Sequence, residues 1–528
     1  MFNKRFLLIL IFIAIIARFI RLDYAPPHLS NDEIGAAYGA YSISKTLRDG
    51  SNQFLPILWA SHGGEGSPLA IYIPLISIMT LGNNDWAVRL PAAILGSFTV
   101  IFIGLLVMEL TKNSRLSLIT SLILAFSPWH FSASRWALES NYALCFIVIG
   151  IYLFFVGLNR NKNWATLLSM FFFALSIYSY YAEWVLTPLI VLSLLFFYRK
   201  TILKRKIYLV AILLLGILVV PLLADLIHHL KTSRASSEFI TQDIGVGRLL
   251  SKHSAPLEKI QIVLRAIADK YSVYNGLDYL FFFGANILPK ENPYQFGFFL
   301  TPLLVPFIWG LYKLKSYFTK HSNFIYFLLF AAPFVASLTE GELNNWRSLP
   351  QLLPISIITA VGVYYFWDNA RKDIRMKVLG WTALVVSLFY FSLIYFIHFP
   401  LERAEGYQYG YKQMASYLNQ HYGEFEKIII DPRFGSAAYY YIGVPSSYIP
   451  FYTNLDPRKV QAAKAVPFGT SFDKYEFREI NWGGEKVQKN YLFIVPSDMT
   501  PDPSLNLKVI HQIPLPNHKI EFKLYSLK

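Results

Sequence analysis

Six connections rich in lysine and arginine alternate with long apolar segments along this chain of 528 residues. They lie at residues 4–5, 112–115, 160–162, 199–206, 313–320 and 371–377, and the connections between them carry acidic residues and few basic ones. In membrane proteins the excess of Lys and Arg is found in the cytoplasmic loops. The alternation therefore predicts a polytopic membrane protein whose acidic and aromatic loops are external.

The composition supports this prediction and excludes other classes of protein. The chain is 54% hydrophobic and only 15% charged, whereas a soluble domain has about a quarter of its residues charged. The net charge of +15 is concentrated in the predicted cytoplasmic connections, so we attribute it to topology and expect no nucleic-acid partner. The single cysteine, Cys145, leaves no disulfide framework and no cysteine zinc site.

A membrane-spanning helix needs about 20 apolar residues. The sequence predicts eleven such helices, with the N-terminus inside and the C-terminus outside, in a plasma (inner) membrane. The first is an uncleaved span, since no small-residue cleavage site follows it. The apolar segment 68–82 is short for a span and predicts an interfacial helix. The predicted spans lie near residues 6–22, 89–110, 116–134, 142–158, 164–180, 184–198, 207–226, 297–312, 323–338, 349–367 and 378–397.

Residues 398–528 differ in character from the rest of the chain. Segments 427–431, 491–495 and 519–525 have the pattern of strands, and 413–421 has that of a helix. The predicted fold is thus an all-α polytopic membrane domain, 1–397, with a small external α/β domain, 398–528. External loops of the membrane domain span 23–88 and 227–296. In the first of these, a helix from about Asp32 is expected to lie with one apolar face along the membrane surface.

The sequence Ser30-Asn31-Asp32-Glu33 follows the first predicted span. Ser30 and Glu33 have the spacing of a capping box at a helix start, which accounts for Glu33 without any catalytic role. The adjacent carboxylate, Asp32, is not needed for capping. Held at the membrane surface, it is a candidate general base toward a bound hydroxyl.

A short external loop at 127–141 contains His130, Arg135 and Glu139 beside Trp129 and Trp136. This loop is richer in groups capable of chemistry than a membrane anchor requires, and charged groups at membrane depth usually face a cavity and a partner. An ion pair between Arg135 and Glu139, four residues apart, is the alternative interpretation.

Two further features allow a structural and a functional interpretation. Arg347 ends an external loop, where its guanidinium suits a phosphate and equally suits contact with ordinary lipid phosphates. Asp85, Trp86 and Arg89 precede a span and are interpreted as interface anchors.

None of the external histidines has a metal-binding spacing. We assign no metal and no cofactor, with a divalent cation left open. These histidines are His28, His62, His228 and His229.

Taken in order, these residues resemble the polytopic, lipid-phosphosugar-dependent glycosyltransferases of the C superfamily. The sequence is most similar to the group of protein O-mannosyltransferases and aminoarabinose lipid A transferases. The resemblance covers about residues 1–400, and the order of its motifs is specific although no single motif is strict. It rests on Asp32-Glu33, Arg89-Leu90-Pro91, the segment 124–130 (Leu-Ala-Phe-Ser-Pro-Trp-His), Ser134-Arg135, Glu139, and Arg347 with Pro350 and Pro354.

The resemblance implies a function and a set of site residues. Asp32 is implied as the catalytic base, with Glu33 in support and Glu139 as a second carboxylate. The implied reaction is an inverting transfer of a sugar from a polyprenyl-phosphate donor to a lipid, glycan or protein acceptor. The candidates for binding the substrate are Arg347, Arg135 and His130.

One departure from the family pattern bears on the donor. The aminoarabinose enzymes have a Lys directly before a Pro in the first external loop, whereas this chain has Ser67 before Pro68. This argues against an aminoarabinose donor. Two alternatives to the implied function remain open. One is a ligase or polymerase acting on a lipid-diphosphate glycan, and the other is a flippase or transporter, which favours ionisable residues within its spans.

Overall fold

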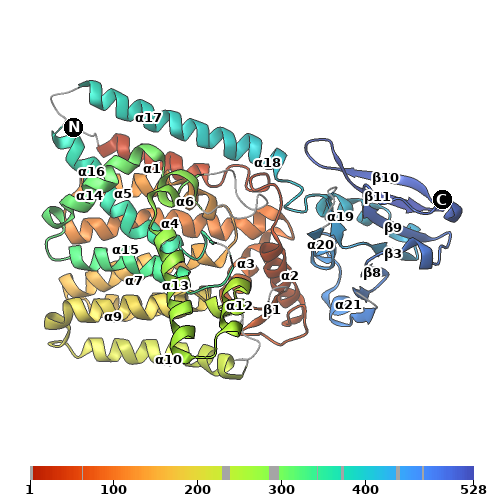
Figure 1. Ribbon diagram of the computed structural model, residues 1–528, viewed down its shortest axis with the longest axis horizontal. Coiled ribbons are helices and arrows are strands. Elements are labelled where there is room, and N and C mark those ends of the chain that lie inside the picture. Colours follow the sequence, from red (N-terminus) through yellow and green to blue (C-terminus); the bar gives the residue numbers. More distant parts are fainter. Residues whose placement is uncertain are drawn as a thin grey trace.

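The computed structural model describes residues 4–61, 64–228, 238–284, 296–341, 343–369, 374–435, 441–466 and 469–527. Figure 1 shows a bundle of long helices that run in similar directions, with a sheet-containing domain formed by the C-terminal part of the chain at one end. This end of the bundle is called the domain end below.

Each predicted span overlaps a helix of the bundle, and the segment 116–134 is divided between two helices. Within the described residues, six helical segments are long and apolar enough to cross a membrane, as in a multi-pass membrane protein. The total of eleven spans stays a prediction. The helices are α1 (Lys4–Ala17), α4 (Asp85–Thr111), α5 (Ser114–Ala125), α6 (Pro128–Ala133), α7 (Glu139–Arg160), α8 (Asn163–Ser179), α9 (Glu183–Ile202), α10 (Ile207–His228), α14 (Leu304–Tyr317), α15 (Ser322–Ser337), α16 (Leu352–Asn369) and α17 (Ile374–Leu393).

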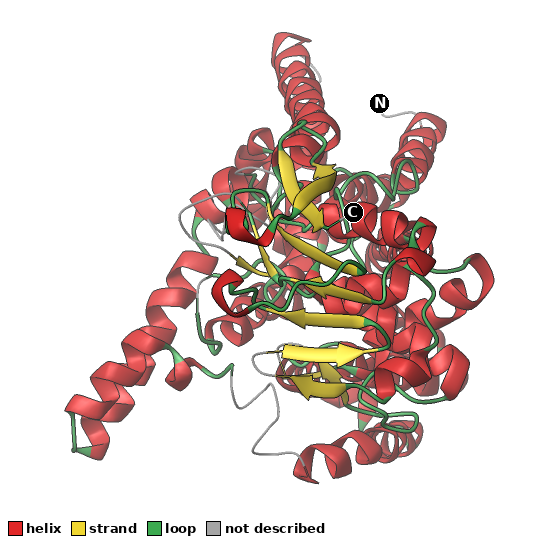
Figure 2. Ribbon diagram, turned by 90° about the vertical axis from the view of Figure 1, so that its right-hand side faces the viewer, coloured by secondary structure: helices red, strands yellow, loops and turns green. Residues whose placement is uncertain are grey.

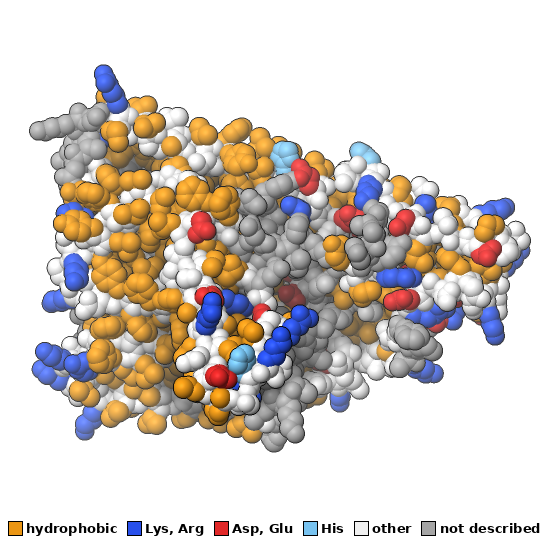
Figure 3. All heavy atoms as spheres, viewed as in Figure 1, with side chains coloured by type: hydrophobic (Ala, Val, Ile, Leu, Met, Phe, Trp, Pro, Cys, Tyr) orange, Lys and Arg blue, Asp and Glu red, His pale blue; other side chains and the backbone are white. Residues whose placement is uncertain are grey.

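The helices alternate in direction, so that the basic connections gather away from the domain end. The turns between α4 and α5, α7 and α8, and α9 and α10 lie at the far end of the bundle, as does the N-terminus. Figure 3 shows Lys and Arg side chains at this end and many hydrophobic side chains along the bundle beside it. The charge alternation read from the sequence therefore separates the two ends of the bundle in space.

Small residues let neighbouring helices of the bundle approach closely. Ser117 and Ser121 of α5 donate hydrogen bonds to the carbonyls of Gly104 and Val100 of α4, at 2.7 and 2.9 Å. Contacts of this kind replace the hydrophobic effect as a source of association between helices surrounded by lipid. They fix the position of α4, and with it the side chains at its first turn.

The domain end carries two shorter helices and a hairpin before α4. These are α2 (Asn31–Thr46), β1 (Trp59–Ser61), β2 (Gly64–Gly66) and α3 (Pro68–Leu81), and α3 is the helix predicted for 68–82. The apolar face of α2 was predicted to lie on the membrane surface. That prediction is wrong, because this face is buried in one core with α3 and the C-terminal domain, through Ile34, Ala37, Tyr38 and Tyr41.

The C-terminal domain contains a mixed sheet of seven strands in the order β10-β11-β9-β3-β8-β7-β6. Strand β3 pairs in parallel with β8 and β9, and the other pairs are antiparallel. Figure 2 shows this sheet with the helices of the molecule around it. The strands are β3 (Lys427–Ile430), β6 (Lys464–Val466), β7 (Gly469–Phe472), β8 (Tyr475–Arg478), β9 (Tyr491–Pro496), β10 (Lys508–Pro514) and β11 (Ile520–Ser526).

The three predicted strands are β3, β9 and β11, and the predicted helix is α19 (Gly410–Gln420). Helices α20 (Pro445–Tyr452) and α21 (Pro457–Gln461) were not predicted. An α/β domain is therefore confirmed within 398–528, while its exact boundary stays a prediction.

Polar contacts at the start of α4 join the C-terminal domain to the bundle. The carboxylate of Asp85 accepts from Lys412 of α19 at 2.9 Å and from the hydroxyl of Tyr452 at 2.5 Å. His28 stacks on Tyr448 with ring centroids 4.8 Å apart, and the Tyr448 hydroxyl donates to the carbonyl of Leu29 at 2.6 Å. These contacts hold the segment before α2 between the two parts of the molecule.

Candidate functional site

A pocket at the domain end brings together three of the six predicted site residues. Asp32 of α2, Glu139 of α7 and Arg347 all line it, although they are far apart in the sequence. We call it the Asp32 pocket. Its remaining walls are formed by Ser67, Leu138, Ser140, Tyr180, Tyr181, Asn344 and Trp346.

Asp32 stands in the first turn of α2, and its side chain is exposed. The predicted capping box is present, because the Glu33 amide donates to the Ser30 hydroxyl at 3.3 Å and the Ser30 amide to the Glu33 carboxylate at 2.9 Å. The cap thus uses Ser30 and Glu33 and leaves the neighbouring Asp32 to line the pocket. This arrangement agrees with the interpretation of Asp32 as the acid that is not required for capping the helix.

Glu33 points away from the pocket into a fully buried ion pair with Arg89 of α4. The Arg89 Nε and Nη2 atoms donate to the two carboxylate oxygens at 2.9 and 3.0 Å. The Ala137 amide also donates to Glu33, at 3.0 Å. Arg89, interpreted from the sequence as an interface anchor, instead joins α2 to α4 and to the segment before α2. Its role was missed because the partner lies 56 residues away.

Three tryptophans place the loop 127–141 beside α2. The Trp136 indole donates to the Ser30 hydroxyl at 3.0 Å and packs edge-on against Trp346, with ring centroids 4.7 Å apart. Trp129 meets the same Trp346 ring at 5.1 Å. Glu139, the first residue of α7 after this loop, is half-buried in the wall of the Asp32 pocket.

Arg135 and His130 are fully buried outside this pocket. The Arg135 guanidinium donates to the carbonyls of Ala17, Arg18, Arg21 and Ala25, which are at or beyond the C-terminal end of α1. A cation suits the unpaired carbonyls and the negative end of a helix. The His130 ring lies 3.1 Å from Arg18. The structure therefore gives these two residues protein partners rather than access to the pocket.

Arg347 is almost fully buried, and its partners come from two other segments and from its own loop. Its Nε donates to the Tyr181 hydroxyl at 2.9 Å, one Nη to the Glu340 carbonyl at 3.0 Å, and the other Nη to the Glu238 carboxylate at 2.6 Å. Burial alone would lower the pKa of Arg347, but Tyr181, Tyr180 and Glu238 outweigh it and raise the pKa above its usual value. The site therefore keeps a permanent cation in the pocket wall.

The two tyrosines and Glu238 were not predicted as site residues. Tyr180 ends the predicted span 164–180, and Tyr181 lies in the short connection that follows it. This connection also contains an acid, Glu183, and the combination was an available signal. Glu238 had no local signal. It reaches Arg347 because Glu238 and Ile240 form backbone hydrogen bonds with Glu340 and Leu338, at 2.7 and 2.8 Å.

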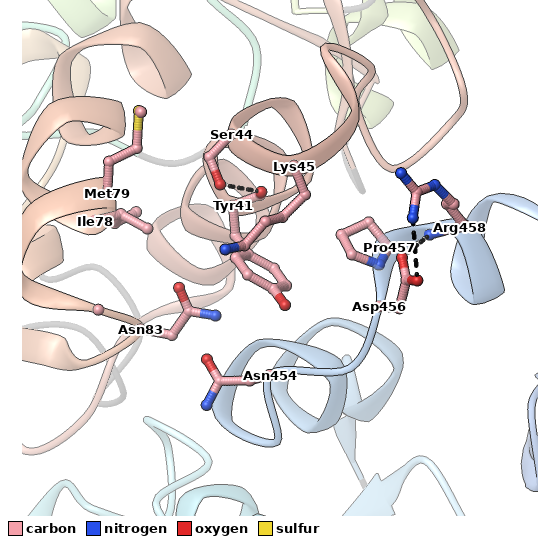
Figure 4. Close-up of a pocket in the computed structure, with 11 residues that line it drawn as sticks. Tyr41, Ser44, Lys45, Ile78, Met79, Asn83, Asn454, Asp456, Pro457 and Arg458 are labelled. Atoms are coloured by element: carbon pink, nitrogen blue, oxygen red, sulfur yellow. Dashed lines mark hydrogen bonds and ion pairs between the residues drawn. The ribbon is translucent and has the colours of Figure 1, made fainter.

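Figure 4 shows a second and larger pocket, of about 590 Å³. Tyr41 and Lys45 near the end of α2 line it, opposite Asn454 of the C-terminal domain. Its one carboxylate, Asp456, is paired with Arg458. Tyr41 lies nine residues after Asp32, which places it on the opposite side of the helix. Despite its volume, this pocket lacks the pair of acids and the buried cation found around Asp32.

The described residues contain no group of three or more His, Cys, Asp or Glu side chains that could hold a metal ion. The structure thus adds no candidate ligands for the divalent cation left open by the sequence.

Known proteins resemble this chain in part of its sequence and in its fold. A family model described as dolichyl-phosphate-mannose-protein mannosyltransferase matches residues 65–224. An uncharacterized protein of Aquifex aeolicus (strain VF5) is 24% identical over 408 residues, which are 75% of this chain and 72% of that protein.

Two solved structures of ArnT from Cupriavidus metallidurans share the fold over nearly the whole chain. The structure bound to undecaprenyl phosphate has a TM-score of 0.61 at 11% identity, and covers 99% of this chain and 98% of ArnT. The apo structure has a TM-score of 0.57 at 12% identity and covers 98% and 97%. The predicted resemblance to the glycosyltransferase C superfamily is confirmed.

Proposed function

We propose that this chain, which has the fold of the C superfamily, transfers a sugar from a polyprenyl-phosphate donor to an acceptor hydroxyl at the Asp32 pocket. The observation that carries the proposal is the meeting of Asp32, Glu139 and Arg347, from three distant segments, in one pocket at the domain end. A base, a second acid and a cation are the groups that such a transfer requires. The ArnT structure named above holds undecaprenyl phosphate, a lipid phosphate of the class proposed here.

The reaction is a single inverting displacement. Asp32 takes the proton of the acceptor hydroxyl as its oxygen forms a bond to the anomeric carbon. The bond from that carbon to the phosphate oxygen breaks at the same time, and the phosphate leaves with the electron pair. Arg347 stabilises the developing negative charge, which is a large part of the catalytic task.

The remaining acids and bases have distinct proposed roles. Glu139, which lines the pocket, is the second carboxylate beside Asp32. Glu33 positions Asp32 through its ion pair with Arg89, rather than touching substrate. Arg135 and His130 are not assigned to the substrate, since backbone carbonyls and Arg18 already bind them.

Ser67 bears on the identity of the sugar. It occupies the position before Pro68 where the aminoarabinose enzymes have a Lys, and it lines the Asp32 pocket. This departure from the pattern of the aminoarabinose enzymes supports a hexose or pentose other than aminoarabinose on the donor.

The domain end is proposed to face the outside of the plasma (inner) membrane. The basic connections lie at the opposite end of the bundle, which suits the cytoplasm. The C-terminal domain and the Asp32 pocket would then be external. A reporter that is active only outside the cytoplasm, fused after Lys528, should be active. Activity of a cytoplasm-only reporter at the same position would reverse this orientation.

The proposed transfer is tested with the purified protein and a panel of radiolabelled polyprenyl-monophosphate sugars. We expect release of the free lipid phosphate with the wild-type chain and none with Asp32→Asn, while Lys45→Ala in the pocket of Figure 4 serves as the matched control. A lipid-diphosphate glycan, offered in parallel, tests the ligase or polymerase alternative. Movement of lipid across vesicles without cleavage would instead indicate a flippase.

A further inference from the structure

A third pocket, of about 280 Å³, lies between α2, β1 and the C-terminal domain. We propose that it binds the acceptor, and that the group bound there is an uncharged, hydroxyl-rich unit such as a sugar residue of a glycan. This inference rests on the proposed transfer at Asp32. We call it the Tyr38 pocket, and its lining includes Gly35, Tyr38, Gly39 and Trp59.

The Tyr38 pocket adjoins the Asp32 pocket along α2. Gly35 and Gly39 follow Asp32 by three and seven residues, a spacing that places all three on one side of the helix. A molecule lying over the two glycines therefore extends toward the proposed base. The pocket of Figure 4 lacks this relationship, since Tyr41 faces the other side of α2.

One hydrogen bond links the linings of the two pockets on the side of the hairpin. The Trp59 indole, in the Tyr38 pocket, donates a hydrogen bond at 3.0 Å to the carbonyl of Ser67, which lines the Asp32 pocket. A Cβ atom at Gly66 would collide with the indole ring, so glycine at that position is needed to seat Trp59 there. This link between the proposed donor and acceptor sites thus depends on the β1–β2 hairpin.

The chemistry of the Tyr38 pocket favours a neutral ligand with hydroxyl groups. None of the described residues that line it is Asp, Glu, Lys or Arg, so a charged group would lose its hydration without gaining a partner. Three residues with hydroxyl groups, Ser51, Ser446 and Thr470, line it together with the aromatic residues Tyr38 and Trp59. A sugar presents both hydroxyls and an apolar C–H face, and it matches both kinds of surface.

Tyr38 provides an independent observation that points to a ligand. Its side chain is 5% exposed, yet its phenol oxygen is buried with no hydrogen-bond partner in the described part of the chain. Buried hydroxyls are nearly always hydrogen-bonded, because leaving one unpaired is unfavourable. Because Tyr38 lines the pocket, a ligand hydroxyl that reaches this oxygen would supply the partner.

The test is binding of short neutral oligosaccharides of mannose, glucose and galactose to the full-length protein in detergent, measured by saturation-transfer NMR. We expect wild-type protein to bind at least one of them, and Tyr38→Phe to weaken that binding by about three- to tenfold, as for the loss of one neutral hydrogen bond. Lys45→Ala, in the pocket of Figure 4, is the matched control and should bind like wild type. Tyr38→Phe should keep the wild-type unfolding temperature, because it removes a hydroxyl without a protein partner.

A second variant tests the pocket by filling it. Gly35→Leu adds a side chain on the side of α2 that bears Asp32, and should abolish oligosaccharide binding. Unchanged binding in both Tyr38→Phe and Gly35→Leu would overturn the proposal. The proposal would also be overturned if a neutral hydroxyl-containing peptide bound and responded to the same variants, while no oligosaccharide bound. Oligosaccharide binding is measured without a donor, so a failure of this proposal is distinguishable from a failure of the proposed transfer. Failure of the transfer would appear as lipid-phosphate sugar that stays intact.

Discussion

The guanidinium of Arg347 donates to the carboxylate of Glu238 at 2.6 Å, in the wall of the pocket that contains Asp32 and Glu139. Both side chains are nearly buried, at 10% and 12% exposure. If Arg347 receives the donor phosphate, this carboxylate competes with it for the same cation. Glu238→Gln should therefore lower the donor KM several-fold, measured in the lipid-phosphate release assay. A raised donor KM would show that Glu238 instead holds Arg347 in position.

Arg347 itself is expected to be needed for donor use. Its guanidinium binds two side chains and a carbonyl at once, a geometry that an ammonium does not reproduce. Arg347→Lys should weaken donor use measurably, and Arg347→Ala should cost on the order of 2–5 kcal/mol in kcat/KM if the pair with phosphate is desolvated. Arg458→Ala, at an exposed arginine, is the control. Full activity of Arg347→Lys would indicate contact with ordinary lipid only.

Asp32→Asn should abolish transfer while the protein stays folded. The change keeps the shape of the side chain and the cap, which depends on Ser30 and Glu33, but removes the proton acceptor. Turnover is measured alongside the unfolding temperature, so that loss of activity is separated from loss of structure. Near-normal turnover by folded Asp32→Asn would exclude this residue as the base and direct attention to Glu139.

Glu33→Gln should affect stability strongly. It leaves the buried guanidinium of Arg89 without its ionic partner, and breaking a buried ion pair costs about 3–5 kcal/mol. The free energy of unfolding in detergent measures this loss. The double variant Glu33→Gln/Arg89→Gln should recover part of the lost stability. Glu402→Gln, which breaks an exposed pair with His398, should cost less than about 1 kcal/mol. Equal losses in both variants would contradict a structural role for Glu33.

The contact between bundle and C-terminal domain should weaken in mild acid through His28. Burial lowers the pKa of His28 to about 4, despite the opposing effect of Asp85, from about 6.5 in the unfolded chain. Between these values the unfolded state binds a proton that the folded state excludes, so stability falls as the pH falls. From pH 7 to 5 the loss should be about 2 kcal/mol.

Unfolding temperatures across this pH range check the prediction for His28. His28→Phe keeps an aromatic ring on Tyr448 and removes the titration, so its unfolding temperature should depend less on pH than that of wild type. An equal pH dependence in the two proteins would assign the effect to other groups.

The local features of the fold were predictable from the sequence because their causes are local. Apolar length determined the helices of the bundle, and the spacing of Ser30 and Glu33 determined the cap of α2. The strands β3, β9 and β11 followed from apolar runs that are buried in the sheet. By contrast, β6, β7 and α21 are short and carry exposed residues, so they lack the periodicity from which an element is predicted.

The candidate site was predictable only in part. Asp32, Glu139 and Arg347 were chosen one by one from loops placed on the same side by charge, and the structure brings them into one pocket. Arg135, like Arg347, was chosen because it lies in a predicted external loop with acidic and aromatic residues. In the structure it instead binds the carbonyls around the end of α1. Sequence position does not distinguish the two, since each guanidinium takes whichever partners the packed helices present.

The sequence by itself determined which segments are apolar, where the positive charge lies and how α2 begins, since these depend on neighbours within a few residues. Only the tertiary structure decided what lies against α2. Its apolar face meets the C-terminal domain rather than lipid, and Arg89 and Glu238 find their partners 56 and 109 residues away. Burial makes such charges pair, but the packing of the whole chain selects the partner.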